Sequence, residues 1–78
     1  MSKTEKAVIA LLQKRNVFMD VEEIFLVLNP DTKCYSYAAV YHSVRTLNQK
    51  GVIVSETRPS ERKKYFRISR AWAEYNIE

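Results

Sequence analysis

The hydrophobic and polar positions in the first half of the chain repeat with the period of an α-helix. The first helical segment opens on the capping-box pattern of Ser2 and Glu5 and is expected to run to about Arg15. Asp20 is placed to cap a second helix that ends at about Leu28, because the proline that soon follows disfavours helical geometry before it. The residues expected to face the core are Val8, Ile9, Leu11, Leu12, Val21, Ile24, Phe25 and Leu28.

A third helical segment, about residues 36–50, has the clearest start and stop signals. Ser36 is a good N-cap, because its hydroxyl can accept a hydrogen bond from a backbone N–H of the first turn. Gly51 suits the left-handed residue that closes a helix. The stripe expected to be buried comprises Tyr37, Val40, Val44 and Leu47. The opposite face carries Ala38, Ala39, His42, Arg45, Thr46 and Gln49, a mixture of small and hydrogen-bonding side chains that suits a DNA major groove.

The pattern after this helix favours two β-strands. Residues 52–57 and 64–68 are rich in β-branched and aromatic side chains, and Pro59 marks a turn between them. Side chains alternate along a strand, so the two faces of the second strand can be assigned. That strand is expected to bury Phe66 and Ile68 and to place Tyr65, Arg67 and Ser69 on its other side.

Two shorter segments complete the pattern. Val17–Met19 is expected to be a short extended piece between the first two helices. Ser69 can cap a last helix over about residues 70–77, in which Trp72 and Tyr75 are the large side chains.

The resulting order is helix, short strand, helix, helix, strand, strand, helix. This is a mainly α fold with a small β-hairpin, the order of a winged helix-turn-helix domain. We expect one such domain over residues 1–78, with a recognition helix at about 36–50 and a wing at about 52–68. A chain of 78 residues can bury only a modest core, which leaves little sequence for a deep active site.

Charge is unevenly distributed in this chain, whose net charge is +4. Residues 20–31 carry four acidic and no basic side chains, whereas residues 52–70 carry six basic and two acidic ones. A polyanion would therefore meet one basic side. The single cysteine, Cys34, excludes an internal disulfide, fits a reducing cytoplasm and is expected to be incidental. No apolar run is long enough to predict a membrane span or a secretory signal.

Two runs of sequence resemble the DNA-binding half of the ferric uptake regulator family: V-E-E-I-F-L-V-L, and then S-Y-A-A-V-Y-H-S-V-R-T-L-N-Q-K-G-V-I. In that family the recognition helix and the residues after it read roughly T-V-Y-R-x-L-x-x-L-x-x-x-G-L-V. Here Ala39-Val40-Tyr41-His42 stands in the place of T-V-Y-R, and Gly51-Val52-Ile53 matches G-L-V. Val44 and Leu47 take the two apolar positions between them, and the resemblance covers about residues 5–68.

The resemblance implies a DNA-binding regulator whose third helix enters the major groove, with Tyr41 and His42 at motif positions that touch DNA. Ala39 and His42 replace the threonine and arginine of the motif, so a different base preference is expected. The dimerisation domain of the family is not expected in so short a chain. One His and one Cys cannot build its metal sites, so no metal or other cofactor is predicted. Small viral or mobile-element regulators have this form, and we expect the chain to be one of them.

The predicted DNA-binding residues lie on the third helix, just before it and on the wing. Arg45 is favoured as a base reader because Arg is the commonest reader of guanine. Basic side chains at the wing tip can grip phosphates or enter the minor groove. The full set is Lys33, Tyr35, Ser36, Ala38, Ala39, Tyr41, His42, Arg45, Thr46, Arg58, Arg62, Lys63 and Lys64.

Each of these assignments has a structural alternative. Tyr41 could pack beside the buried stripe, and His42 could be a solvated surface residue. The wing charges could serve to prevent pairing between sheet edges. Trp72 and Tyr75 could belong to the core or to a homodimer formed through the first and last helices.

The sequence thus predicts a sequence-specific, double-stranded DNA-binding transcriptional regulator, with no membrane or small-molecule partner. A protein-interaction winged helix without DNA binding is the alternative. An enzyme is not expected, because a chain with one glycine has no glycine-rich phosphate loop and no Cys/His or Ser/His/Asp set is evident.

Overall fold

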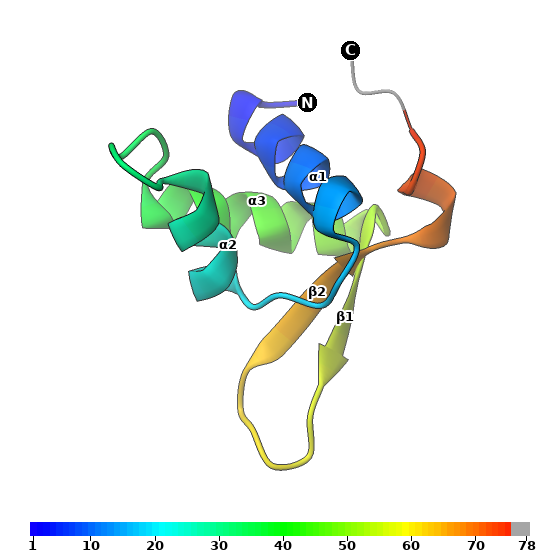
Figure 1. Cartoon of the computed structure of the whole chain (residues 1–78). Helices are drawn as coiled ribbons and strands as arrows, with labels where there is room; N and C mark the ends of the chain where they lie inside the picture. Colours follow the sequence, from blue (N-terminus) through cyan, green and yellow to red (C-terminus); the bar gives the residue numbers. More distant parts are fainter. Residues whose placement is uncertain (76–78) are drawn as a thin grey trace.

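Three helices and an antiparallel hairpin form the fold, seen in a computed structural model in which residues 1–75 are described (Figure 1). The hairpin projects away from the helices, and α1 lies across α3. The elements are α1 (Lys3–Arg15), α2 (Val21–Leu28), α3 (Tyr37–Gln49), β1 (Ile53–Thr57), β2 (Lys64–Ile68) and the short 3₁₀ helix η1 (Arg70–Trp72). The predicted class, a mainly helical winged helix-turn-helix, is confirmed.

Side-chain caps fix where the three α-helices begin. In α1 the backbone N–H of Glu5 donates to Ser2 Oγ at 3.1 Å, and the carboxylate of Glu5 accepts from the N–H of Ser2 at 2.8 Å. Asp20 and Glu23 make the same reciprocal pair at the start of α2. Each pair satisfies backbone N–H groups that have no partner within the helix. The helix starts predicted from the caps are therefore confirmed.

The core lies between the three helices and the base of the hairpin. The side chains of Ile9, Leu12, Ile24 and Leu47 are almost completely buried there. The apolar stripes predicted for α1 and α3 supply most of the core, and Val52, Ile53, Phe66 and Ile68 close it from the hairpin side. Val21, Phe25 and Leu28 of α2 are only partly buried, because α2 covers the core at its edge.

The segment before α2 ties the hairpin to the helices. Met19 and Phe66 form an isolated antiparallel bridge in which each backbone N–H donates to the other's carbonyl at 2.8 Å. The extended piece predicted at Val17–Met19 is thus present as a single bridge. β1 and β2 pair in a register that places Ile53 opposite Ile68.

Gly51 lets the chain turn from α3 into β1. Its φ of +78° lies in the left-handed region that other residues rarely adopt. The N–H of Val52 then donates to the carbonyl of Leu47 at 3.0 Å, which closes the end of the helix. The prediction that Gly51 closes α3 is therefore confirmed.

The predicted C-terminal helix at 70–77 is wrong over the part that the structure describes. Only the 3₁₀ turn Arg70–Trp72 forms, and residues 76–77 of the prediction lie outside the described residues. Gln13 holds this segment against α1, since its Nε2 donates to the carbonyls of Trp72 at 2.9 Å and Tyr75 at 2.7 Å. The predicted cap at Ser69 is also missing: its hydroxyl accepts no backbone N–H of η1, and it is buried without a hydrogen-bond partner among the residues described.

Tyr37 and Tyr65 also depart from their predicted burial. Tyr37 was expected in the buried stripe of α3, but 44% of it is exposed, because it stands in the first turn of the helix, where the Phe25 ring of α2 meets it only by an edge. Tyr65 was expected on the open face of β2, but only 8% of it is exposed. The guanidinium of Arg58 covers its ring at 3.8 Å. Among residues 1–75, no helix is long and apolar enough to cross a membrane.

Candidate nucleic-acid interface

One side of α3 is open to solvent. Ser36 caps the helix, because its Oγ accepts a hydrogen bond from the N–H of Ala39 at 3.1 Å. Turn by turn, the exposed residues that follow are Tyr37, Ala38, Tyr41, His42, Arg45 and Gln49. Ala39 and Thr46, which the sequence placed on this face, are half-buried at its margins, because helices packed on the other side shield them.

Three aromatic rings line the start of this open face. The Phe25 ring meets the Tyr37 ring edge-on, with centroids 5.4 Å apart. Tyr37 and Tyr41 stack one turn apart, with centroids at 6.5 Å and planes inclined by 21°. Because 51% of Tyr41 is exposed, the alternative in which it packs into the core is wrong. Tyr37 belongs to the same surface, which the sequence did not predict.

A groove of about 620 Å³ separates α3 from the wing and from the start of α2. Tyr41 and Arg45 border it from α3. Arg62, Lys63 and Lys64 border it from the wing, and Asp20 and Glu22 from α2. The fold therefore brings together predicted residues that lie some twenty positions apart. His42 stands outside this groove on the exposed side of α3.

The wing tip holds one of its cations in place. Arg58 lies over the Tyr65 ring, and its Nε is 3.4 Å from a carboxylate oxygen of Glu56. The Nη1 of Arg58 also lies 3.9 Å from a carboxylate oxygen of Glu61. The hydroxyl of Tyr65 donates to Glu61 at 2.6 Å, and this hydrogen bond raises the pKa of Tyr65. Glu56, Glu61 and Tyr65 thus engage the guanidinium of Arg58 within the protein.

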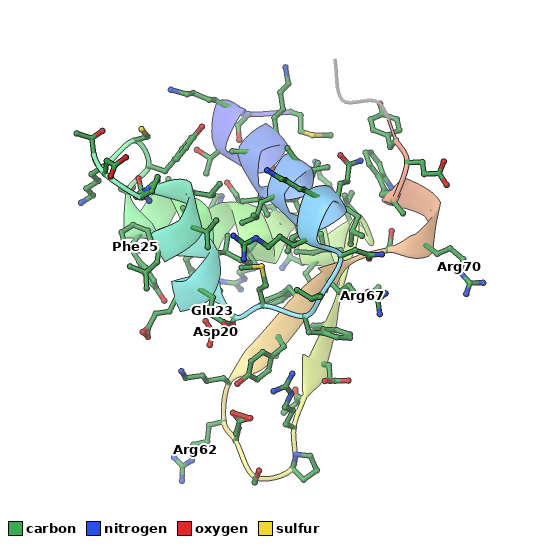
Figure 2. The ribbon with its side chains drawn as sticks, viewed as in Figure 1. Asp20, Glu23, Phe25, Arg62, Arg67 and Arg70 are labelled. Atoms are coloured by element: carbon green, nitrogen blue, oxygen red, sulfur yellow. The ribbon has the colours of Figure 1, made fainter. Side chains whose placement is uncertain are left out.

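The other three wing cations differ in their surroundings. Lys63 Nζ lies 3.5 Å from Asp20 Oδ2, and the charge of Asp20 raises the pKa of Lys63. Arg62 and Lys64 are exposed and form no ion pair with any residue that the structure describes. Figure 2 shows Arg62 extending outward from the loop of the hairpin, away from the helices.

The segment before α3 is organised by Asn29, which was not among the predicted site residues. Its Oδ1 accepts the backbone N–H groups of Cys34 at 2.6 Å and Tyr35 at 2.8 Å. Its Nδ2 donates to the carbonyl of Phe25. Tyr35 is half-buried with Lys3 at 5.4 Å from its ring, whereas Lys33 is exposed. An Asn immediately before a Pro was the available signal, since Asn often bonds nearby backbone.

The side chains of this region do not fit a metal centre. Residues 1–75 contain no group of three or more His, Cys, Asp or Glu side chains placed to hold an ion. His42 is the single histidine of the chain, and Cys34 is exposed on a different segment. The acids of the groove, Asp20 and Glu22, face lysine and arginine side chains instead.

Comparison with known proteins places this geometry in a family. The sequence pattern of the ferric uptake regulator family matches residues 1–76. No individual curated protein matches the sequence.

Three solved structures share the fold. A structure of PerR-Zn-Zn from GAS matches with a TM-score of 0.77 and 20% identity, over 87% of this chain and 43% of that one. PerR from Streptococcus pyogenes, described for its peroxide sensing and gene regulation, matches with a TM-score of 0.76 and 20% identity, over 87% and 46%. The ferric uptake regulator from Francisella tularensis, determined with iron, matches with a TM-score of 0.79 and 13% identity, over 90% and 53%. The chain thus spans about half the length of these solved relatives.

Proposed function

Because this chain belongs to the ferric uptake regulator family, a family of regulators and not of enzymes, we propose that it is a sequence-specific double-stranded DNA-binding transcription regulator. The observation that carries the proposal is the groove. It sets the open face of α3 beside the two wing cations, Arg62 and Lys64, that have no ion-pair partner in the described residues. A helix face and a basic hairpin on one side of a small domain suit the major groove and the adjoining backbone of a duplex.

In this proposal α3 reads base edges. Ala38 at the first turn leaves room for the helix backbone to approach the groove floor, while Arg45 and His42 carry donors further along. Arg45 borders the groove, so it can reach either a guanine edge or a phosphate. Tyr41, exposed and held by stacking on Tyr37, offers an apolar ring and a hydroxyl to the same surface.

The wing supplies affinity more than sequence choice. Arg62 points outward from the hairpin and Lys64 begins β2, so both can approach phosphates or the minor groove beside the site read by α3. Lys33 and the capped start of α3 at Ser36 can contact backbone at the other end of the helix.

We further propose that two copies read a palindromic site as a homodimer through α1 and the segment after β2. Gln13 fastens that segment to α1 through the carbonyls of Trp72 and Tyr75. The Tyr75 ring lies 4.2 Å from Trp72 and is 49% exposed, which leaves an aromatic surface beside α1. Measurement of mass in solution, by sedimentation with and without a duplex, tests the dimer; a single copy on each bound duplex would contradict it.

Selection of duplexes from a random library, followed by titration of the selected duplex and a random one, tests the function. We expect tighter binding to the selected duplex at physiological salt. His42→Ala and Arg45→Ala should each change the selected sequence. Arg70→Ala removes the same charge as Arg45→Ala from η1, away from the wing tip, and should not (Figure 2). Equal binding to both duplexes by the wild type would overturn the proposal and favour the protein-interaction alternative.

A further inference from the structure

The carboxylate of Asp20 makes one contact with the start of α2 and another with the wing. Its Oδ1 accepts the N–H of Glu23 at 2.8 Å, which caps α2. Its Oδ2 lies 3.5 Å from Lys63 Nζ, across 43 residues of sequence. The carboxylate is nearly enclosed, with 11% of the side chain exposed, whereas 58% of the Lys63 side chain is exposed. Asp20 is therefore the fixed partner of this pair, and Lys63 is the arm that reaches to it.

The ion pair lies directly beside a backbone attachment. Met19, next to Asp20, exchanges two hydrogen bonds of 2.8 Å with Phe66, three residues after Lys63. The bridge holds the middle of β2 at Phe66, whereas the ion pair holds Lys63, the residue just before β2 on the side of the hairpin loop. Two attachment points, one on β2 and one on the residue that leads into it, fix both the position and the direction of the strand relative to α2, which one point alone would not do.

The neighbours of Lys63 contrast with it. Arg62 and Lys64 flank it in sequence and have no ion-pair partner in the part of the chain that is described. Glu22 also borders the groove and adds to the negative charge that faces Lys63. A lysine already balanced by a nearly enclosed carboxylate has less to gain from a phosphate than its free neighbours.

We propose that Lys63 is a positioning residue of the wing, whose ion pair with Asp20 fixes the wing cations against the start of α2, the helix that packs on α3, and so sets the spacing between α3 and the wing cations. The inference rests on the proposed DNA-binding function and changes the role first assigned to Lys63, which was that of a phosphate contact. Arg62 and Lys64 are then the phosphate contacts of the wing. Sequence selectivity depends on Lys63, because a fixed spacing lets Arg45 and Arg62 engage one duplex at the same time.

Asp20→Asn gives the sharpest test, because asparagine also caps helices well but carries no charge. Removal of a negative charge from the groove would by itself tighten binding to every duplex. If Lys63 positions the wing, Asp20→Asn instead lowers the ratio of selected to random binding, by about two- to fivefold for an ion pair of this exposure. Lys63→Met should lower the ratio by a similar factor, and the double variant should lose no more than either single variant. Lys63→Arg keeps the ion pair and should restore the ratio.

Lys64→Met is the matched control, since it removes a neighbouring charge that has no partner. It should weaken selected and random duplexes alike and lower the slope of log affinity against log salt by about 1. Lys63→Met should leave that slope nearly unchanged. Amide order parameters measured by NMR on the free protein give a second readout, in which Asp20→Asn and Lys63→Met should loosen residues 58–63 while α3 stays unchanged.

The outcomes separate this inference from the function on which it rests. If Asp20→Asn binds both duplexes more tightly with an unchanged ratio, Lys63 is a phosphate contact and the positioning role is overturned. An unchanged order parameter in the wing of both variants would also overturn it. If the wild type itself does not discriminate between duplexes, the proposed function fails, and the positioning role fails with it.

Discussion

The open face of α3 and the wing both carry basic residues, but their surroundings differ. On α3, His42 and Arg45 make no hydrogen bond or ion pair with any described side chain, so their polar groups are available to a partner. On the wing, Arg58 and Lys63 are engaged by carboxylates of the protein itself, and Arg62 and Lys64 are not. Charge counted along a sequence therefore overstates the charge that a surface offers, because neighbouring acids can neutralise part of it.

The comparison implies that specificity lies on α3. Arg45→Ala should cost about 1–3 kcal/mol of binding to the selected duplex and much less to a random one, because a base contact is lost. Titration of both duplexes by fluorescence anisotropy measures the difference. Arg62→Ala is the control from the wing, and it should weaken both duplexes to a similar extent. An equal loss for both duplexes in Arg45→Ala would make Arg45 a phosphate contact.

The stability of α3 should depend on its local cap. Ser36→Ala leaves the N–H of Ala39 without its acceptor and should lower the free energy of unfolding by about 1 kcal/mol. Urea denaturation followed by circular dichroism measures this value. Ser60→Ala, in the exposed turn of the wing, is the matched control and should change the stability little. A loss no larger than that of the control would show that packing, and not the cap, fixes the start of α3.

The two arginines of the wing loop should separate stability from salt dependence. Arg58→Ala removes the cover of the Tyr65 ring and should lower stability by about 0.5–1 kcal/mol, with little change in the salt slope of DNA binding. Arg62→Ala should leave stability unchanged and lower that slope by about 1. Chemical denaturation and titration at several salt concentrations measure the two effects. If the two variants behave alike in both measurements, the distinction between engaged and free cations is wrong.

The smallest effects expected are those of pH, which should act on the wing through Tyr65 in alkali and on α1 through Glu5 in acid. The hydrogen bond to Glu61 raises the pKa of Tyr65, so its stabilising effect is complete below the ordinary pKa and is lost as pH rises through the folded value. The hydrogen bond from the N–H of Ser2 lowers the pKa of Glu5, so that effect is complete above its ordinary pKa and is lost in acid.

Tyr65→Phe should therefore flatten the loss of stability above about pH 10, and Glu5→Gln should flatten the loss below about pH 4.5. Gln keeps an oxygen that can accept from the N–H of Ser2, so it removes the titration and leaves the capping geometry. Thermal melting of both variants across pH measures this. An unchanged acid limb in Glu5→Gln would assign the acid sensitivity to other carboxylates.

Predictions from the sequence succeeded where structure is fixed by neighbours in the chain. The end of α1 at Arg15 and that of α2 at Leu28 agree with the structure, and α3 begins just after its predicted cap. Caps and Gly51 act within one turn, and apolar spacing sets which face is buried. The two strands of the wing were placed to within one residue, because β-branched and aromatic residues and the turn at Pro59 are also local signals.

Predictions failed where a residue distant in sequence decides the outcome. Gln13 holds the segment after Ser69 against α1 through the carbonyls of Trp72 and Tyr75, and this segment forms only a 3₁₀ turn. Arg58 buries Tyr65 against the alternation of its strand, and α2 meets Tyr37 only through the edge of the Phe25 ring. Within the candidate interface, the sequence named both Arg58 and Lys63 but could not show that carboxylates engage them.

The sequence by itself determined the three helices, the hairpin and the helix face that α3 presents, because caps, glycine conformation and apolar period act over a few residues. Only the tertiary structure decided which basic side chains are available and where the wing stands. Asp20 meets Lys63 across 43 positions, and the strength of such a contact depends on distance and burial, which no local pattern specifies.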